Sequence, residues 1–195
     1  LIFSYAISAE TTIDHQIFDR LLKKYVKENR VDYTNFMNDR KELLQYLKQF
    51  ETISLSNLDR NEQLALYINA YNAFTIELIL QNYKIPIKSI KDIKAPWDIK
   101  FCNISGAIYS LNEIENKFLR EKLKEPRIHF AINCASISCP PLQNFAFTAE
   151  KIDSQLNDVA TQFMKNPLGV NIKHDTLEVS QIFNWETNRE TLNLF

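Results

Sequence analysis

The sequence predicts an α+β protein of one domain, with N-terminal helices and a buried central helix packed on a small, mainly antiparallel sheet. Apolar residues at helical spacing dominate the first half of the 195-residue chain. Short segments suited to strands and hairpins follow in the second half. No repeat, low-complexity tract or linker divides the chain, and its length suits one core. We therefore expect residues 10–195 to form a single domain.

Two packing helices are expected before residue 51. A helical stripe covers residues 12–28, with Thr12 or Asp14 as the N-cap, and its apolar positions are Ile13, Ile17, Leu21, Leu22 and Tyr25. The tripeptide Val31-Asp32-Tyr33 interrupts this pattern. Residues 33–50 then predict a second helix, because Phe36, Leu43 and Leu47 again follow a helical period.

A long helix over residues 59–83 is apolar nearly all round, which is typical of a buried central helix. Asn69 and Asn72 lie three positions apart and share one face of it, and buried amides need hydrogen-bond partners. Tyr67 and Tyr71 add hydroxyl groups at a spacing of four. Two interpretations remain open: the amides tie down neighbouring loops, or they line a site.

The second half of the chain alternates short elements. Residues 85–101 predict an ordered loop, and residues 102–109 a hairpin around Gly106. Ser110 and Glu113 form a capping box that opens a helix to about residue 123, before Pro126. The short, bounded apolar run 128–133 predicts a buried strand. A helix over residues 148–165 and a hairpin of 170–172 with 176–179 complete the chain.

Composition excludes several functional classes. Lys and Arg number 23 and Asp and Glu 24, for a net charge of −1, so no basic surface is expected for nucleic acid. With two glycines, the chain lacks Gly-rich phosphate loops. No run approaches the roughly 18 apolar residues of a membrane span. The C-x4-C pair of Cys134 and Cys139 supplies too few ligands for a typical metal site, and we expect neither a metal nor a cofactor.

The first nine residues indicate export. Residues 1–9 are apolar and small, and they end in Ala-Ile-Ser-Ala before a polar stretch, as a signal peptide does at its cleavage site. The alternative is a short buried strand or the lead-in to a helix. We expect an exported protein, periplasmic or extracellular, whose cysteines meet an oxidising compartment.

The segment RIHFAINCASISCPPL, residues 127–142, concentrates the chemistry of the chain. On a strand, His129 and Asn133 would share a face and approach the cysteines that follow. One interpretation is a thiol-dependent hydrolase or acyl/amide transferase. Cys134 or Cys139 would attack the substrate, and His129 would act as the base. Glu115 or Asn69 would orient the imidazole of His129. Backbone amides of Ser136 or Ser138 would steady an oxyanion.

A disulfide is the alternative chemistry for the same segment. A disulfide between Cys134 and Cys139 can form if the loop between them turns back. Because this loop is short, its closure would stabilise the folded protein little. The bond would be structural, in a non-catalytic binding or scaffold domain, or redox-active. We expect the ligand to be a small molecule or peptide-like, and the substrate-binding candidates are Asn69, Tyr71, Asn72, Asn133, Ser136 and Ser138. The oligomeric state stays open.

Several blocks together resemble the family named domain of unknown function 547. They are EQLALYINAYNAFTIELIL, SLNEIENKFLR, RIHFAINCASISCPPL followed by FTAEKIDSQLNDVATQFM, and VSQIFNWE. The resemblance implies export, as in many bacterial members, but no particular activity. The family motif maps onto Asn69, Tyr71, Asn72, Glu115, His129, Cys134, Ser138 and Cys139.

This sequence departs from the family at Asn116, where members often have His, which weakens any mechanism that needs a second histidine. Ala135 holds a position that is commonly Gly or Ala. A looser fold-level similarity to papain- and transglutaminase-like proteins places a buried helix against a His-bearing strand. Here that helix carries Asn69 and Asn72 instead of a cysteine.

Overall fold

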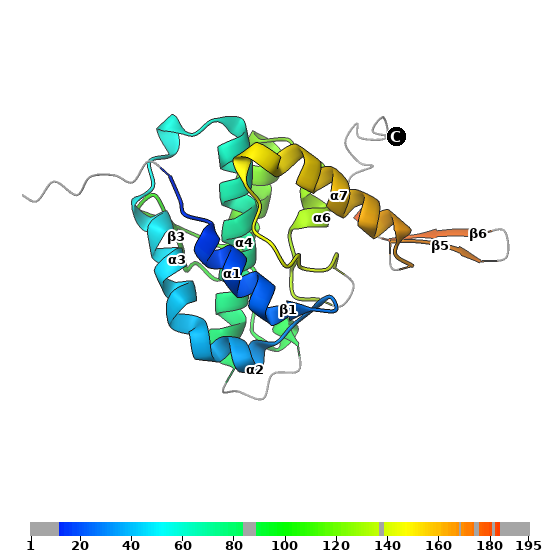
Figure 1. The fold of residues 1–195 in the computed structure, drawn as a ribbon, viewed down its shortest axis with the longest axis horizontal. Coiled ribbons are helices and arrows are strands. Elements are labelled where there is room, and N and C mark those ends of the chain that lie inside the picture. The colour runs from blue at the N-terminus through cyan, green and yellow to red at the C-terminus, as the bar shows by residue number, and fades with distance from the viewer. Residues whose placement is uncertain are drawn as a thin grey trace, which may run out of the picture.

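A computed structural model describes residues 12–83, 89–136, 139–167, 169–173, 176–180 and 182–183. The expected signal-peptide remnant, residues 1–9, lies outside the described residues, and so does Ser138. In the described residues, helices surround a central helix and short antiparallel hairpins lie between and beyond them, as Figure 1 shows. The predicted α+β class is therefore confirmed.

The N-terminal part consists of helices and one tight hairpin. Its elements are α1 (Gln16–Tyr25), β1 (Val26–Lys27), β2 (Arg30–Val31), α2 (Tyr33–Phe36), η1 (Met37–Asp39) and α3 (Arg40–Thr52). The first helix ends earlier than expected, because Glu28 and Asn29 both have positive φ, at 50° and 63°. Two such residues in sequence form the turn that suits a two-residue hairpin. The Asp32 side chain then accepts a hydrogen bond from the backbone N–H of Asn35 and caps α2.

Helix α4 (Arg60–Asn82) is the centre of the fold, preceded by the short turn η2 (Leu55–Asn57). Its side chains are buried continuously from Leu64 to Leu80, as its apolar sequence predicted. Asp59 and Glu62 form the capping box that begins it. In Figure 1, α3 lies to the left of α4, α1 crosses in front of it, and α6 and α7 lie to its right. Every face of α4 therefore contacts another part of the chain.

The next segment contains η3 (Ile90–Asp92), the hairpin β3 (Cys102–Ile104) with β4 (Ala107–Tyr109), and α5 (Leu111–Glu113). The hairpin and the Ser110–Glu113 capping box were both predicted and are confirmed. α5 continues directly as the π-helix η4 (Ile114–Lys122). π-Helical turns are rare and are frequently found at functional sites. This one carries Glu115.

The predicted strand over residues 128–133 is wrong: Ile128–Ala131 form the one-turn helix α6. The backbone N–H of Ile132 donates to the carbonyl of Ile128 at 2.9 Å, which closes the turn. A short apolar run satisfies a strand and a buried helical turn equally well, and periodicity does not separate them. The alternation that would have put His129 and Asn133 on one face of a sheet therefore does not exist.

Each described strand pairs with one neighbour, in three separate antiparallel hairpins. The expected small sheet is thus three pieces, and α4 packs mainly against helices. The chain continues through η5 (Ala149–Lys151) and α7 (Ile152–Lys165) to the predicted hairpin of β5 (Val170–Lys173) and β6 (Thr176–Val179). In Figure 1 this last hairpin projects beyond the helical body.

Candidate functional site

Asn69 fixes the segment before α7 to the central helix. Its side-chain amide donates to the carbonyl of Phe147 at 2.8 Å and accepts from the N–H of the same residue at 2.9 Å. Asn69 is fully buried, and Phe147 lies 78 positions further along the chain. The side chain therefore acts on this segment as a neighbouring strand would, satisfying both backbone groups of one residue.

Asn72 makes a similar pair of hydrogen bonds one turn further along α4, but to two residues of the chain after α6. Its amide donates to the carbonyl of Ala131 at 3.0 Å, and its oxygen accepts from the N–H of Asn133 at 2.8 Å. The two bonds hold the chain on either side of Ile132, directly after α6. The Asn69 and Asn72 amides thus tie down loops, one of the two interpretations left open by the sequence. Their role as substrate ligands stays a prediction.

Asn133 closes the loop that follows. Its side-chain amide donates to the carbonyl of Pro140 at 2.8 Å, and its oxygen accepts from the N–H of Ala135 at 2.8 Å. One side chain therefore bridges the beginning and the end of the segment that contains both cysteines. Ala135 has a φ of 59°, in the left-handed region that favours glycine.

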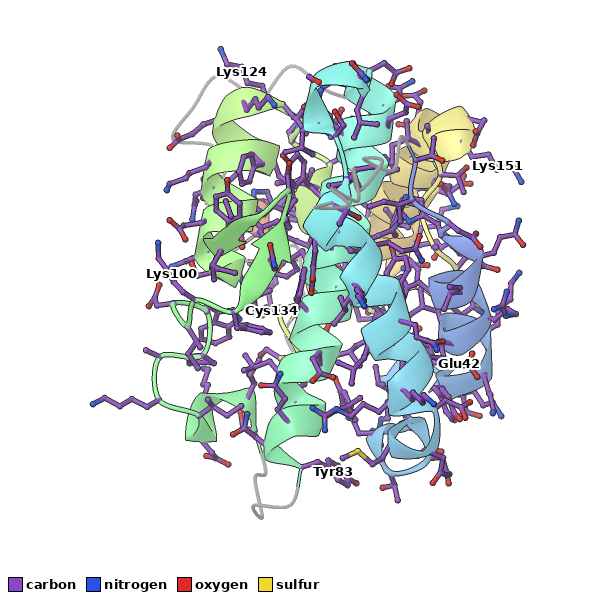
Figure 2. All side chains as sticks on the ribbon, turned by 90° about the vertical axis from the view of Figure 1, so that its left-hand side faces the viewer. Glu42, Tyr83, Lys100, Lys124, Cys134 and Lys151 are labelled. Carbon is purple, nitrogen blue, oxygen red and sulfur yellow. A yellow bond between two sulfur atoms is a disulfide. The ribbon has the colours of Figure 1, made fainter. Side chains whose placement is uncertain are left out.

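Cys134 and Cys139 form a disulfide, with their Cα atoms 6.4 Å apart. Both cysteines are only partly buried. In Figure 2 the labelled Cys134 lies beside the middle of α4, whereas the labelled lysines lie on the outline of the molecule. The disulfide interpretation is the one that the structure bears out, and neither sulfur is a free thiol in this state. A nucleophilic role for either cysteine would require the reduced protein.

Cys102 is the remaining cysteine, and it is a free thiol. It lies at the start of β3 with no exposed surface. Burial raises the pKa of this thiol well above its usual value. A buried thiol that stays protonated is inert toward substrates.

His129, Glu115 and Tyr71 form a second cluster. Nδ1 of His129 lies 3.9 Å from Oε1 of Glu115, and these side chains are 5% and 22% exposed. Burial, followed by the charge of Glu115 and its hydrogen bond to the phenol, raises the pKa of Tyr71. The carboxylate on the π-helix therefore touches a histidine from α6 and a tyrosine from α4. The sequence named all three as site residues, and the structure brings them together.

The remaining predicted residues lie in the disulfide loop. The backbone N–H of Cys139 donates to the carbonyl of Ser136 at 3.0 Å, which tightens the loop. Oxyanion binding by the amides of Ser136 and Ser138 stays a prediction, and Ser138 lies outside the described residues.

Two cavities lie near α7. The larger, of about 630 Å³, is bordered by the beginning of α1 and by residues 145–155, including His15, Asp19, Glu62 and Glu150. None of the site residues predicted from the sequence is among its lining residues. The smaller, of about 200 Å³, includes Pro140 and Pro141 directly after Cys139. Sequence reasoning missed both, although the Cys-Pro-Pro step marked one wall of the smaller one.

None of the helices in the described parts of the chain is long and apolar enough to cross a membrane. Over the same residues, no group of three or more His, Cys, Asp and Glu side chains is arranged to hold a metal ion.

Fold and site define a class: a mainly helical α+β domain whose buried central helix holds, through asparagine side chains, a loop closed by a partly exposed disulfide. Residues 55–164 match the family model described as "Protein of unknown function, DUF547", and the chain belongs to that family. The match runs from η2 to the last turn of α7 and includes every site residue predicted from the sequence. No curated protein and no solved structure matches the chain. The similarity to papain- and transglutaminase-like proteins stays a prediction.

Proposed function

We propose that this protein performs thiol–disulfide exchange through the Cys134–Cys139 disulfide. The observation that carries the proposal is the double closure of the loop. The disulfide joins two partly exposed cysteines, and the Asn133 amide joins the same two ends of the loop through Pro140 at 2.8 Å. A second closure by hydrogen bond lets the loop keep its shape when the covalent bond opens.

The energetic role of the disulfide is small. Its cysteines are five positions apart in the sequence. Closing so short a loop lowers the entropy of the unfolded chain by an amount that stabilises the fold by only about 2 kcal/mol. Asn72 independently fixes the chain at Asn133, one residue before Cys134, at 2.8 Å. The fold is therefore held without the sulfur–sulfur bond, as an exchange-competent protein requires. Partly exposed disulfides are also those with the higher, more oxidising potentials.

The reaction is a two-electron exchange. A substrate thiolate attacks one sulfur, a mixed disulfide forms as the Cys134–Cys139 bond breaks, and the second cysteine leaves as a thiolate. A second substrate thiolate then releases the first as a substrate disulfide. Two substrate thiols are oxidised and the protein disulfide is reduced to two thiols, with both protons passing to the cysteines. A low-molecular-weight disulfide such as glutathione disulfide would restore the oxidised protein.

The test is the reduction potential of the pair. The Cys102→Ala variant, which leaves only the two loop cysteines, is equilibrated in glutathione buffers of graded ratio. Trapped thiols are then counted by mass. We expect a midpoint between about −120 and −270 mV, the range of exchange proteins. A midpoint below about −300 mV, typical of structural disulfides, would contradict the proposal.

A thiol-dependent hydrolase or acyl/amide transferase is the second candidate, and the His129–Glu115 pair favours it. A carboxylate 3.9 Å from Nδ1 is placed to orient an imidazole that acts as a base. The reduced Cys102→Ala protein, tested with peptide and small amide substrates, should then lose activity on His129→Gln substitution. Activity that needs no reduction, or that survives alkylation of both loop cysteines, would exclude this role.

Export to the periplasm or the cell exterior is also proposed. A partly exposed disulfide persists in oxidising compartments and is rare in the cytosol, which supports it. Fractionation of cells that produce the full-length gene product, followed by alkylation of its free thiols, measures both location and redox state. Recovery in the cytosol with three alkylated cysteines would oppose the proposal.

A further inference from the structure

The smaller cavity begins where the disulfide loop ends. Its wall near the loop is Pro140 and Pro141, and its floor is Phe130 of α6 with Val159 and Phe163 of α7. The rings of Phe130 and Phe163 lie 5.6 Å apart, centre to centre, and both are buried. His129 and Glu115 are not among the residues that line the cavity, so it belongs to the loop and not to the acid–base cluster.

The mouth of the cavity is made of uncharged amides. Asn29 comes from the tip of the β1–β2 hairpin, Gln143 from the chain after Pro141, and Gln162 from α7. Among the described residues, those that line the cavity carry no charge. In Figure 1 the β1–β2 hairpin reaches toward the loop between α6 and α7. Segments far apart in sequence therefore converge at the cavity.

We propose that this cavity takes the apolar side chain next to a reactive cysteine in a peptide substrate. The proposal rests on the exchange function proposed above, and it names the substrate class for the same site. A volume of about 200 Å³ holds one side chain and is too small for a drug-sized ligand, which needs roughly 300 Å³ or more. The occupant is therefore one residue of a larger molecule.

The lining selects which residue enters. The lining combines aromatic and aliphatic side chains with uncharged amides, so it accepts an apolar side chain, which gains by leaving water. A Glu or Lys side chain would lose its hydration here without meeting an opposite charge. Carboxamides both donate and accept hydrogen bonds, which suits the backbone of an extended peptide at the mouth. Pro140 follows Cys139 directly, so a peptide cysteine at the disulfide brings its neighbour to the cavity.

The experiment compares peptides that differ only in the residue beside a single cysteine: Leu, Glu or Lys, placed before or after it. Oxidised Cys102→Ala protein is mixed with an excess of each peptide in the presence of an alkylating agent that traps each freed loop thiol, and the initial rate at which the Cys134–Cys139 bond opens is measured by mass spectrometry. Glutathione, which has no apolar side chain, is the reference thiol. We expect the Leu peptides to react about tenfold faster than the charged ones, the ratio that roughly 1.4 kcal/mol of burial provides.

Two substitutions on α7 locate the effect. Gln162 is exposed at the mouth, and Gln162→Trp should reduce the preference for Leu to less than about twofold while glutathione reacts at an unchanged rate. Thr161→Trp, also exposed but outside the cavity, is the matched control and should keep the preference. Gln162→Glu adds charge without bulk and should raise the rate of the Lys peptides relative to the Glu peptides.

The outcomes separate the two proposals. Failure of the protein to react with glutathione and with every peptide would overturn the exchange function itself. Reaction with glutathione but equal rates for all peptides, or a Leu preference that Gln162→Trp leaves intact, would overturn the substrate pocket alone.

Discussion

Asn72 on the central helix accepts a hydrogen bond from the backbone N–H of Asn133 at 2.8 Å, across 61 positions of sequence. The same side chain donates to Ala131 at 3.0 Å. A buried amide of the central helix therefore anchors the chain directly before the disulfide loop.

Asn72→Ala should lower the free energy of unfolding by about 2–4 kcal/mol, because one buried and one partly buried backbone group lose their partner. Urea unfolding followed by circular dichroism measures the loss. Asn82→Ala is the control: Asn82 lies on the same helix, and its side-chain amide donates to the carbonyl of Leu78 within that helix. The control should lose less than about 1 kcal/mol. Equal losses would show that Asn72 does not hold the loop.

Asn133→Ala should cost more in the reduced protein than in the oxidised one. The disulfide and the Asn133–Pro140 hydrogen bond close the same loop, and removing either leaves the other to do so. We expect a non-additive difference of about 1 kcal/mol between the two redox states. Urea unfolding of the Cys102→Ala protein, with and without reductant, gives the four values. Strict additivity would mean that the two closures are independent.

Ala135→Gly should stabilise the protein, since Ala135 has a φ of 59° and a side chain in this region costs about 1 kcal/mol. Ala95, with a φ of 47°, should respond in the same direction. Ala107 pairs with Ile104 in a regular hairpin, and Ala107→Gly should instead destabilise by about 0.5–1 kcal/mol. Thermal unfolding of the three variants distinguishes the signs, and a loss at Ala135 would contradict the prediction.

Acid should weaken the protein through His15, whose Nδ1 lies 2.8 Å from the hydroxyl of Tyr46. Burial lowers the pKa of His15 from 6.5 to about 4, although the charges of Asp14 and Glu150 act to raise it. Between these values the unfolded chain binds the proton and the folded chain does not. The stability that neutral, buried His15 contributes to the fold is therefore fully present above pH 6.5 and is lost as the pH falls toward 4.

The size of this effect should be about 2 kcal/mol between pH 7 and pH 4.5. Carboxylates titrate in the same range, so the measurement is the difference between the wild type and His15→Gln, which keeps a hydrogen-bonding side chain beside Tyr46. Unfolding curves at several pH values should diverge below pH 6.5. Parallel curves would show that His15 takes up its proton equally in both states.

The central helix was predictable from sequence because its evidence is local. Residues 59–83 are apolar on every side, and only a buried helix of that length satisfies such a pattern. The same local reasoning failed at residues 128–133. A run this short has no period, and the choice between strand and helix depended on its tertiary contacts. One of them is the packing of Phe130 on Phe163 of α7, whose ring centres lie 5.6 Å apart.

The site was predictable as a set of residues but not as a set of contacts. Asn69 and Asn72 were recognised because buried amides need partners, but the partners lie 59 to 78 positions away and are backbone groups that any residue supplies. Asn133 was expected to bind substrate, and the structure uses its amide to close the loop. The cavity beside Pro140 was not foreseeable, because its walls come from the β1–β2 hairpin, α6 and α7.

The bridge from Asn133 to Pro140 also has a kinetic consequence. A loop that keeps its shape without the disulfide holds the two thiols at a high effective concentration toward each other. A mixed disulfide formed at one cysteine would then be displaced by its neighbour far faster than by any thiol in solution. Complexes with substrates would be short-lived in the native protein and would accumulate only when one of the two sulfurs has been removed.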